Sequence, residues 1–431
     1  MVSRTTDRRG IFSKAVPFTA KQDKILNIFF YAIFGSAFVS MLGVILYYVY
    51  AFAAKTHGSM DFDWLLGIFS DFVYIMNVSL EESPYLVEDS SYPPIAIAVL
   101  YPFALICKGV FAKYSSEVLT VDQLTSKVVL HPQFWIAMWV FFLVCSFIII
   151  ALVCVRYKLP LKQTIKVGII ILASAPFVYA VMRGNTIYFA MIFLLLFLVL
   201  YESQSAVLRE VGYVCLVLAG LIKIYPLFFG VFLLAKKKIW ASARIAIYYF
   251  VLFFLSFLLL EGGLDHFAPF IENLGGFAGN ELRLIEGNNL SITSILYRIA
   301  YVLRIPDSGF NVINVVVLLC VFAVATVTAI FTRSDFSRLV IASAVVVLIP
   351  SVSYFYVLVF TMLPFMEFLM NYEKLPISKQ RLYFVLFTVL FLTPLILSKY
   401  FILQSLAVIV MLTVECVGVF KNELSVRLRK S

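Results

Sequence analysis

Asp71 is the residue of this sequence that is best placed to act as a general base. It lies in the run Gly67-Ile-Phe-Ser-Asp71-Phe-Val-Tyr74, among aromatic side chains and within the polar stretch 55–92. A general base must present a carboxylate or an imidazole within reach of the proton that it removes. Most loop aspartates are only solvated or cap a helix, so this hypothesis depends on the setting. Two proline turns, Ser83-Pro-Tyr85 and Tyr92-Pro-Pro94, follow and lead the chain into the next apolar run.

Two cations, Lys223 and Arg183, are flanked by apolar residues. Lys223 stands near the middle of an apolar run, where its side chain reaches water less easily than at the ends. A phosphate group would be a reason to keep an ammonium there. Arg183 belongs to the short turn Arg183-Gly-Asn185, which is equally well explained as a hairpin turn between two apolar runs.

Asparagines introduce the amphipathic stretch from Ile292 to Arg304, in the run Asn288-Asn-Leu-Ser291. Two interpretations remain open for Asn289. Its amide either binds sugar hydroxyls or belongs to the polar start of an interfacial helix.

The composition shows what must position these residues. The chain has 431 residues, of which 63% are hydrophobic and 13% are charged. Soluble domains carry about 25% charged residues, so the sequence predicts an all-α polytopic membrane bundle of about 10–13 membrane helices. We treat residues 1–431 as one integral membrane domain. The expected membrane segments are 26–54, 93–111, 133–155, 167–182, 185–202, 210–234, 241–260, 310–332, 338–371 (split near Pro350), 382–398 and 400–420.

The net charge of +10 is distributed as expected for membrane topology and gives no reason to expect nucleic acid. Basic residues gather in segment 1–25, in the loop Lys236-Lys-Lys238 and in the tail 421–431, which we therefore place in the cytoplasm. The loops 55–92 and 261–308 then lie on the outer face, with interfacial helices in the first. The basic loop 156–166 returns inside only if 93–111 and 210–234 are pairs of half-helices, with breaks at Pro102 and Lys223.

The sequence gives no support for a metal or a cofactor. The three histidines do not cluster, the HExxH pattern is absent, and the six cysteines form no CxxC pair. No Walker A or GxGxxG nucleotide loop is present either.

The order of the motifs between about residues 60 and 360 resembles the GT-C superfamily of membrane glycosyltransferases. The most similar group is the glycosyltransferase 87 family of polyprenyl-phosphate-mannose-dependent mannosyltransferases. The motifs that carry the resemblance are Asp71-Phe-Val-Tyr74, Ser83-Pro-Tyr85, Tyr92-Pro-Pro94, Arg183-Gly-Asn185, Leu221-Ile-Lys223-Ile-Tyr-Pro226, Asn289-Leu-Ser291 and Pro350-Ser-Val-Ser353.

The resemblance implies an inverting transfer on the outer, periplasmic or extracellular face of a bacterial plasma membrane. The donor would be a hexose, such as mannose, on a polyprenyl phosphate, and the acceptor a lipid or glycan. Asp71 would be the general base, and Lys223 and Arg183 would hold the donor phosphate. Donor or acceptor would contact the remaining motif residues, which are Tyr74, Tyr85, Tyr92, Asn185, Asn289 and Tyr356.

The chain departs from the family pattern at two of these positions. Asn185 stands where the family often has Gln, and Tyr356 stands where the family tends to have His. Tyr356 can donate a hydrogen bond, but it cannot carry the positive charge of an imidazolium.

Two other functions compete with glycosyl transfer. A flippase of polyprenyl-linked glycans would show internal repeats with paired broken helices, and no convincing repeat is visible. An acyltransferase or a polysaccharide polymerase would need a histidine or an arginine-rich outer loop.

Overall fold

The computed structural model describes residues 17–53, 68–87, 90–392 and 402–428. Within these ranges the protein is built from helices, and the one strand-like pairing is a single bridge between Asn289 and Tyr354. Most of the basic N-terminus, the first part of the loop 55–92 and the end of the basic tail lie outside the described residues. The architecture agrees with the predicted all-α membrane bundle.

Six helical stretches of the described chain are long and apolar enough to cross a membrane. They are Ala20–Gly43, Pro132–Tyr157, Ile239–Phe257, Asp307–Phe331, Phe355–Lys374 and Ile402–Lys421. These stretches lie in α1 (Ala20–Ala53), α8 (Pro132–Tyr157), α14 (Ile239–Phe257), α18 (Asp307–Phe331), α20 (Met362–Asn371) with its flanking 3₁₀ turns, and α22 (Ile402–Leu428). The remaining membrane helices are shorter or broken.

The middle of the bundle is formed by helices that are apolar on every side. Every residue of α19 (Asp335–Leu348) from Phe336 onward is buried, and α11 (Ile187–Leu200) is nearly as covered. A helix without a polar face must be surrounded by protein or lipid, and these two are surrounded by protein. Helix α12 (Ala206–Ile222) packs against α11, and α22 packs against α19 and against α21 (Ile377–Phe391).

Prolines explain two breaks in the apolar runs. Segment 167–182 divides into α9 (Leu161–Ala173) and α10 (Ala175–Arg183), which are bent by 57° where Pro176 begins the second helix. Segment 338–371 divides as predicted, because α19 ends at Leu348 and the 3₁₀ turn η3 (Phe355–Thr361) begins only after Pro350.

The segment around Lys223 folds back on itself, as the half-helix interpretation predicts. Helix α12 ends at Ile222, and the chain returns through the 3₁₀ turn η1 (Tyr225–Gly230) and α13 (Val231–Ala235). The Lys236 ammonium, just after α13, pairs with Glu202 and donates to the Tyr201 hydroxyl at 3.0 Å. Since Tyr201 and Glu202 precede α12, both ends of this hairpin lie together.

Segment 93–111 is also broken, but the predicted break at Pro102 is wrong. Helix α5 (Pro94–Ala98) ends before Val99, and Pro102 lies in the first turn of α6 (Tyr101–Tyr114). Proline is tolerated in a first helical turn, because the N–H that it lacks has no intrahelical partner there. After α7 (Val121–Val128), the chain comes back toward α6, where His131 hydrogen-bonds the Tyr114 hydroxyl at 3.0 Å.

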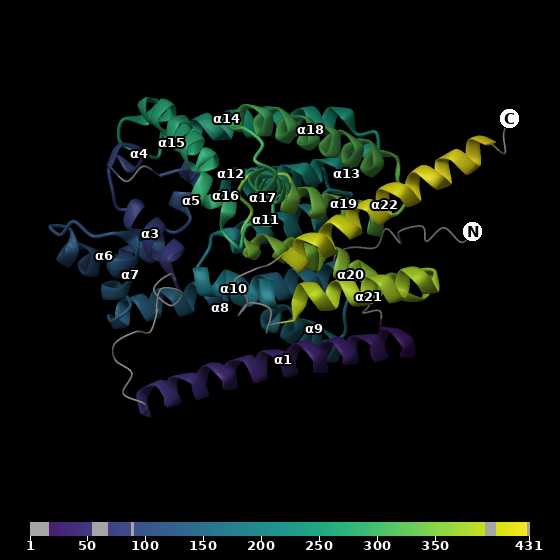
Figure 1. Ribbon diagram of the computed structural model, residues 1–431, viewed down its shortest axis with the longest axis horizontal. Helices are drawn as coiled ribbons and strands as arrows, with labels where there is room; N and C mark the ends of the chain where they lie inside the picture. The colour runs from purple at the N-terminus through teal and green to yellow at the C-terminus, as the bar shows by residue number, and fades with distance from the viewer. Residues whose placement is uncertain (1–16, 54–67, 88–89, 393–401, 429–431) are drawn as a thin grey trace.

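Contacts among the described residues define two opposite ends of the molecule. At the basic end, Lys166 donates to the Asn27 Oδ1 atom at 2.5 Å, Arg156 donates to the Leu198 carbonyl at 2.5 Å, and Lys236 pairs with Glu202. The loop 156–166 therefore lies with the other basic loops, as the charge pattern predicts. Figure 1 shows the short helices α3 to α7 gathered at the other end, which we call the site end.

The site end is completed by the second polar loop. It contains the 3₁₀ turn η2 (Gly263–His266), α15 (Phe267–Gly279), α16 (Glu281–Ile285) and the amphipathic α17 (Ile292–Leu303). Asn273 of α15 donates to the Tyr85 carbonyl at 2.9 Å, next to α4 (Pro84–Val87). The two loops that were predicted to share one face are thus in direct contact (Figure 1).

Candidate active site

The Asp71 carboxylate is held by two side chains, one on each oxygen. Asp71 lies in the first turn of α3 (Ser70–Val78), where the helix dipole favours a negative charge. The Arg183 guanidinium donates to Oδ1 at 2.5 Å, and the Asn185 amide donates to Oδ2 at 2.6 Å. Only 12% of the Asp71 side chain is exposed. The carboxylate therefore has a fixed orientation and keeps one open side.

The backbone around this carboxylate is fixed by a close contact between α3 and α10. The Phe69 N–H donates to the Met182 carbonyl at 2.5 Å, and Phe69 has a positive φ of 66°. Gly184 also has a positive φ, 63°, and a Cβ atom there would lie 2.3 Å from the Phe72 Cβ atom. Glycine is needed at this turn both for its conformation and for the close approach.

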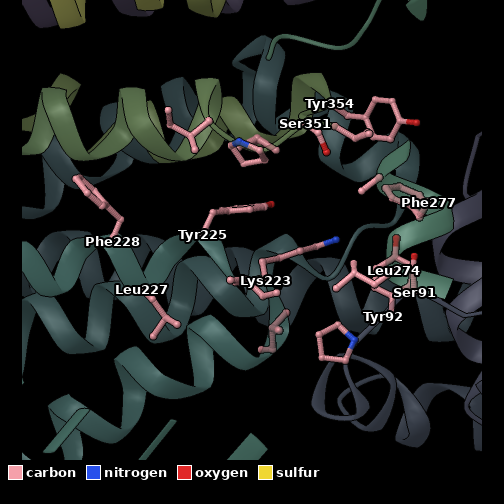
Figure 2. Close-up of a pocket in the computed structure, with 18 of the residues that line it drawn as sticks. Ser91, Tyr92, Lys223, Tyr225, Leu227, Phe228, Leu274, Phe277, Ser351 and Tyr354 are labelled. Carbon is pink, nitrogen blue, oxygen red and sulfur yellow. The ribbon is translucent and has the colours of Figure 1, made fainter. Parts of the chain in front are cut away.

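Lys223 lies at the tip of the hairpin formed by α12, η1 and α13. Its Nζ atom is 4.5 Å from the ring centre of Tyr92 and 5.7 Å from that of Tyr356. No carboxylate of the described residues is within ion-pair distance of this ammonium, and its charge is stabilised by the two aromatic faces and, from a longer distance, by Asp71. Figure 2 shows its side chain extended into the cavity, with Tyr225 alongside and Tyr92 and Tyr354 beyond its end.

The Tyr92 side chain next to Lys223 is a neutral phenol. Burial, followed by the negative charge of Asp71, raises the pKa of Tyr92 well above its usual value. The hydroxyl therefore stays protonated and can donate a hydrogen bond.

The turn 350–356 is joined to the second polar loop by Asn289. The Asn289 oxygen accepts the N–H groups of Ser291 and Ser353, each at 3.1 Å. Its nitrogen donates to the carbonyls of Arg283 and Ser351, also at 3.1 Å each. Because the oxygen and the nitrogen of its side-chain amide both hydrogen-bond to the protein, Asn289 links the two loops.

One cavity of about 1500 Å³ brings most of these groups together. Its polar part is lined by Asp71, Arg183 and Lys223. Its apolar part is lined by Leu227, Phe228, Leu234, Ile245, Phe250 and Phe322. In Figure 2, Leu227 and Phe228 lie on the side away from the Lys223 ammonium. The cavity thus combines a charged region with a long apolar region.

The predicted site residues divide into two groups. Asp71, Tyr74, Tyr92, Arg183, Lys223 and Tyr356 line the cavity. Tyr85, Asn185 and Asn289 are buried next to it but do not line it. The Tyr85 hydroxyl donates to the Tyr92 carbonyl at 2.8 Å, and the ring packs against Phe270. These three residues support the site, and their direct contact with a substrate stays a prediction.

Two charged cavity residues, Asp122 and Arg283, were missed by the sequence analysis. Tyr225 and Ser351 also line the cavity, and they belong to quoted motifs in which they were given no role. Asp122, exposed on α7, is the second carboxylate of the cavity wall. Arg283 donates to the Tyr354 hydroxyl at 3.2 Å and lies 4.0 Å from the ring centre of Phe277. Arg283 and Asp122 belong to polar segments in which many charged residues are solvated, so no local signal distinguishes them.

The described chain contains no group of three or more His, Cys, Asp or Glu side chains that could hold a metal ion. Asp61 and Asp63 fall in the part of the first loop that the structure does not describe. The absence of a metal or cofactor stays a prediction.

Comparison with known proteins gives one family. The sequence model of glycosyltransferase family 87 matches residues 91–361. This range contains Arg183, Asn185, Lys223 and the turn 350–356, whereas Asp71 precedes it. None of the curated proteins compared matches the chain.

Proposed function

The chain belongs to glycosyltransferase family 87, and we propose that it transfers a hexose from a polyprenyl-phosphate donor, with inversion, to a lipid or glycan acceptor. The enzyme is an integral membrane protein, and the transfer takes place on the outer face. Membership of a transferase family favours this activity over a flippase of similar lipids. Mannose is the sugar that we expect.

Asp71 is the general base of this proposal. The acceptor hydroxyl loses its proton to the open side of the carboxylate as its oxygen attacks the anomeric carbon. Arg183 and Asn185 each donate a hydrogen bond to one oxygen of the Asp71 carboxylate, and they act as positioning residues. Arg183 lines the cavity while its guanidinium donates to Asp71 at 2.5 Å, and its predicted contact with the donor phosphate stays part of this proposal.

Lys223 stabilises the leaving group. As the new glycosidic bond forms, the bond between the anomeric carbon and the phosphate oxygen breaks, and the phosphate takes the electron pair. A polyprenyl phosphate leaves as a stable anion, so the site needs a cation for it and no second acid. Lys223 has three donors and forms no ion pair with a carboxylate of the described residues, which fits a phosphate partner.

The apolar part of the cavity fits the polyprenyl chain. Phe228, Ile245 and Phe322 come from three different elements and line it continuously with the Lys223 region. A water-soluble nucleotide sugar would leave this apolar lining uncovered. A lipid-linked donor covers it and gains about 25 cal/mol for each Å² of apolar surface that it buries.

One observation carries the proposal: a fixed carboxylate and an ammonium without an ion-pair partner in the described part of the chain line one cavity that continues into an apolar region. The test is transfer by the purified protein from a radiolabelled polyprenyl-phosphate hexose to extracted membrane lipids. A nucleotide-linked hexose serves as the matched donor. Product from the lipid donor alone, with inverted anomeric configuration, is expected. Transfer from the nucleotide sugar, or retention of configuration, would refute the proposal.

A further inference from the structure

A second hollow, of about 350 Å³, lies at the basic end of the molecule, opposite the active site. Its wall carries four cations from three elements. Arg209 comes from the first turn of α12, Lys237 and Lys238 from the turn after α13, and Arg244 from α14. The Tyr213 side chain completes the hollow. Tertiary packing, and not sequence alone, therefore concentrates this positive charge.

The carboxylates nearby do not balance these cations. Glu202 pairs with Lys236, and Glu210 pairs with Arg244 at 3.0 Å. Arg209 donates to the Ser203 carbonyl at 3.1 Å. Among the residues that the structure describes, no carboxylate lies within ion-pair distance of Lys237 or Lys238. Three of the four cations therefore have no carboxylate partner among the described residues, and the hollow has a net positive charge.

The backbone holds the two lysines in place. Lys237 has a positive φ of 57°, and the N–H groups of Lys237 and Lys238 donate to the carbonyls of Leu234 and Leu233, each at 2.9 Å. Burial lowers the pKa of Lys238, and the charges of Lys236 and Arg209 lower it further against the opposing effect of Glu202. A bound anion would relieve this unfavourable crowding of like charges.

Apolar side chains border the same hollow. Ile239 is 67% exposed and Trp240 is 85% exposed. In a membrane protein, tryptophan next to lysine and arginine marks the level of the lipid headgroups. An anion that approaches here would therefore carry acyl chains, which Ile239 and Trp240 can contact.

We propose that this hollow binds the phosphate of an anionic phospholipid from the leaflet at the basic end. Lys237 and Lys238 supply charge-assisted hydrogen bonds to the phosphate, and Arg209 adds its guanidinium. Trp240 and Ile239 contact the upper part of the acyl chains. The proposal concerns a site distant from the catalytic cavity and does not depend on the proposed donor or acceptor.

Native mass spectrometry of the purified full chain tests this site. The protein is titrated with phosphatidylglycerol, phosphatidylcholine or inorganic phosphate. We expect one tightly bound phosphatidylglycerol, and about 30-fold weaker binding in the double variant Lys237→Gln and Lys238→Gln, because each lysine near an anionic headgroup contributes about fivefold. Lys237→Arg with Lys238→Arg should retain the lipid.

The matched control is the double variant Lys24→Gln and Lys162→Gln, which removes two exposed lysines outside the hollow. It should bind phosphatidylglycerol like the wild type. An equal loss in the control would mean that general surface charge attracts the lipid, and the proposal would fail. Equal affinity for phosphatidylcholine, or binding of inorganic phosphate in preference to the lipid, would also overturn it.

Discussion

The Asn185 amide connects the Asp71 carboxylate to the start of α11. Its nitrogen donates to Asp71 Oδ2 at 2.6 Å, while its oxygen accepts the Ile187 N–H at 3.0 Å. Both ends of a fully buried side chain are therefore fixed. The backbone of α11 thus helps to set the position of the carboxylate, although Asp71 itself belongs to the short helix α3 in the first polar loop.

Asp71→Asn should abolish transfer and leave folding and donor binding close to those of the wild type. The amide keeps the size of the side chain but removes its basicity, and loss of a general base typically costs about 100- to 10,000-fold in rate. Initial rates at saturating donor measure the effect. Asp122→Asn, at the exposed carboxylate of the same cavity, is the matched control and should retain most activity. Half the wild-type rate in Asp71→Asn would exclude the assignment.

Asn185→Ala should lower kcat roughly 10- to 100-fold, because a hydrogen bond to a charged group is worth about 1.5–3 kcal/mol. The KM for the donor should change little, since Asn185 does not line the cavity. Thr186→Ala is the control, because its buried hydroxyl has no hydrogen-bond partner in the described structure. Asn185→Gln should recover part of the rate. A raised KM with unchanged kcat would instead identify Asn185 as a substrate contact.

Lys223→Met should weaken binding of a non-hydrolysable polyprenyl-phosphate analogue about 10- to 100-fold. The thermal stability of the donor-free protein should stay unchanged or rise, because the substitution removes a poorly solvated charge. Lys113→Met, an exposed lysine of α6 outside the cavity, is the control. Unchanged affinity together with clear destabilisation would show that Lys223 is structural.

Gly184→Ala should destabilise the protein by about 1–3 kcal/mol and reduce activity at the same time. The new Cβ atom would lie 2.3 Å from the Phe72 Cβ atom, and the φ of 63° is unfavourable for alanine. Gly275→Ala in α15, where nothing lies within 4 Å of the new atom, is the control. Thermal unfolding of the two purified variants compares them. A Gly184→Ala protein as stable as the control would contradict the close packing of α3 on α10.

Single cysteines at positions 162 and 237 should be protected from an impermeant reagent in intact cells, and one at position 276 should be labelled. The ion pair of Lys236 with Glu202 and the contacts of Lys166 place the first two positions at the basic end. Labelling before and after permeabilisation, in a background without native cysteines, gives the comparison. Labelling at 237 but not at 276 would invert the proposed orientation.

The sequence identifies only those charged residues of the site that stand among apolar or aromatic residues, because a charge in such surroundings is exceptional. Asp71 and Lys223 stand out in this way, and the reversal of the chain at Lys223 follows from the proline just after it. The bond between Asp71 and Arg183 could not be predicted. These residues are 112 positions apart, and their contact depends on how α3 packs against α10.

Local signals also misplace some features. Proline marks a break at Pro102, yet the helix ends earlier, at Ala98, and restarts at Tyr101. The sequence left open whether Asn289 binds sugar hydroxyls or begins an interfacial helix, and in the structure both polar atoms of its amide hydrogen-bond within the protein. Whether an amide faces a cavity or a loop is decided by tertiary contacts that residue type does not encode.

The hairpin that carries Lys223 also sets how deep the reaction centre lies. Helix α12 has 17 residues and is about 25 Å long. It begins beside the basic loop, so Lys223 lies close to the far boundary of a hydrocarbon layer that is about 30 Å thick. The phosphate of a lipid in that leaflet already sits at this height. Under the proposed function, a lipid-linked donor thus reaches the site by lateral diffusion, with its phosphate remaining at the membrane surface.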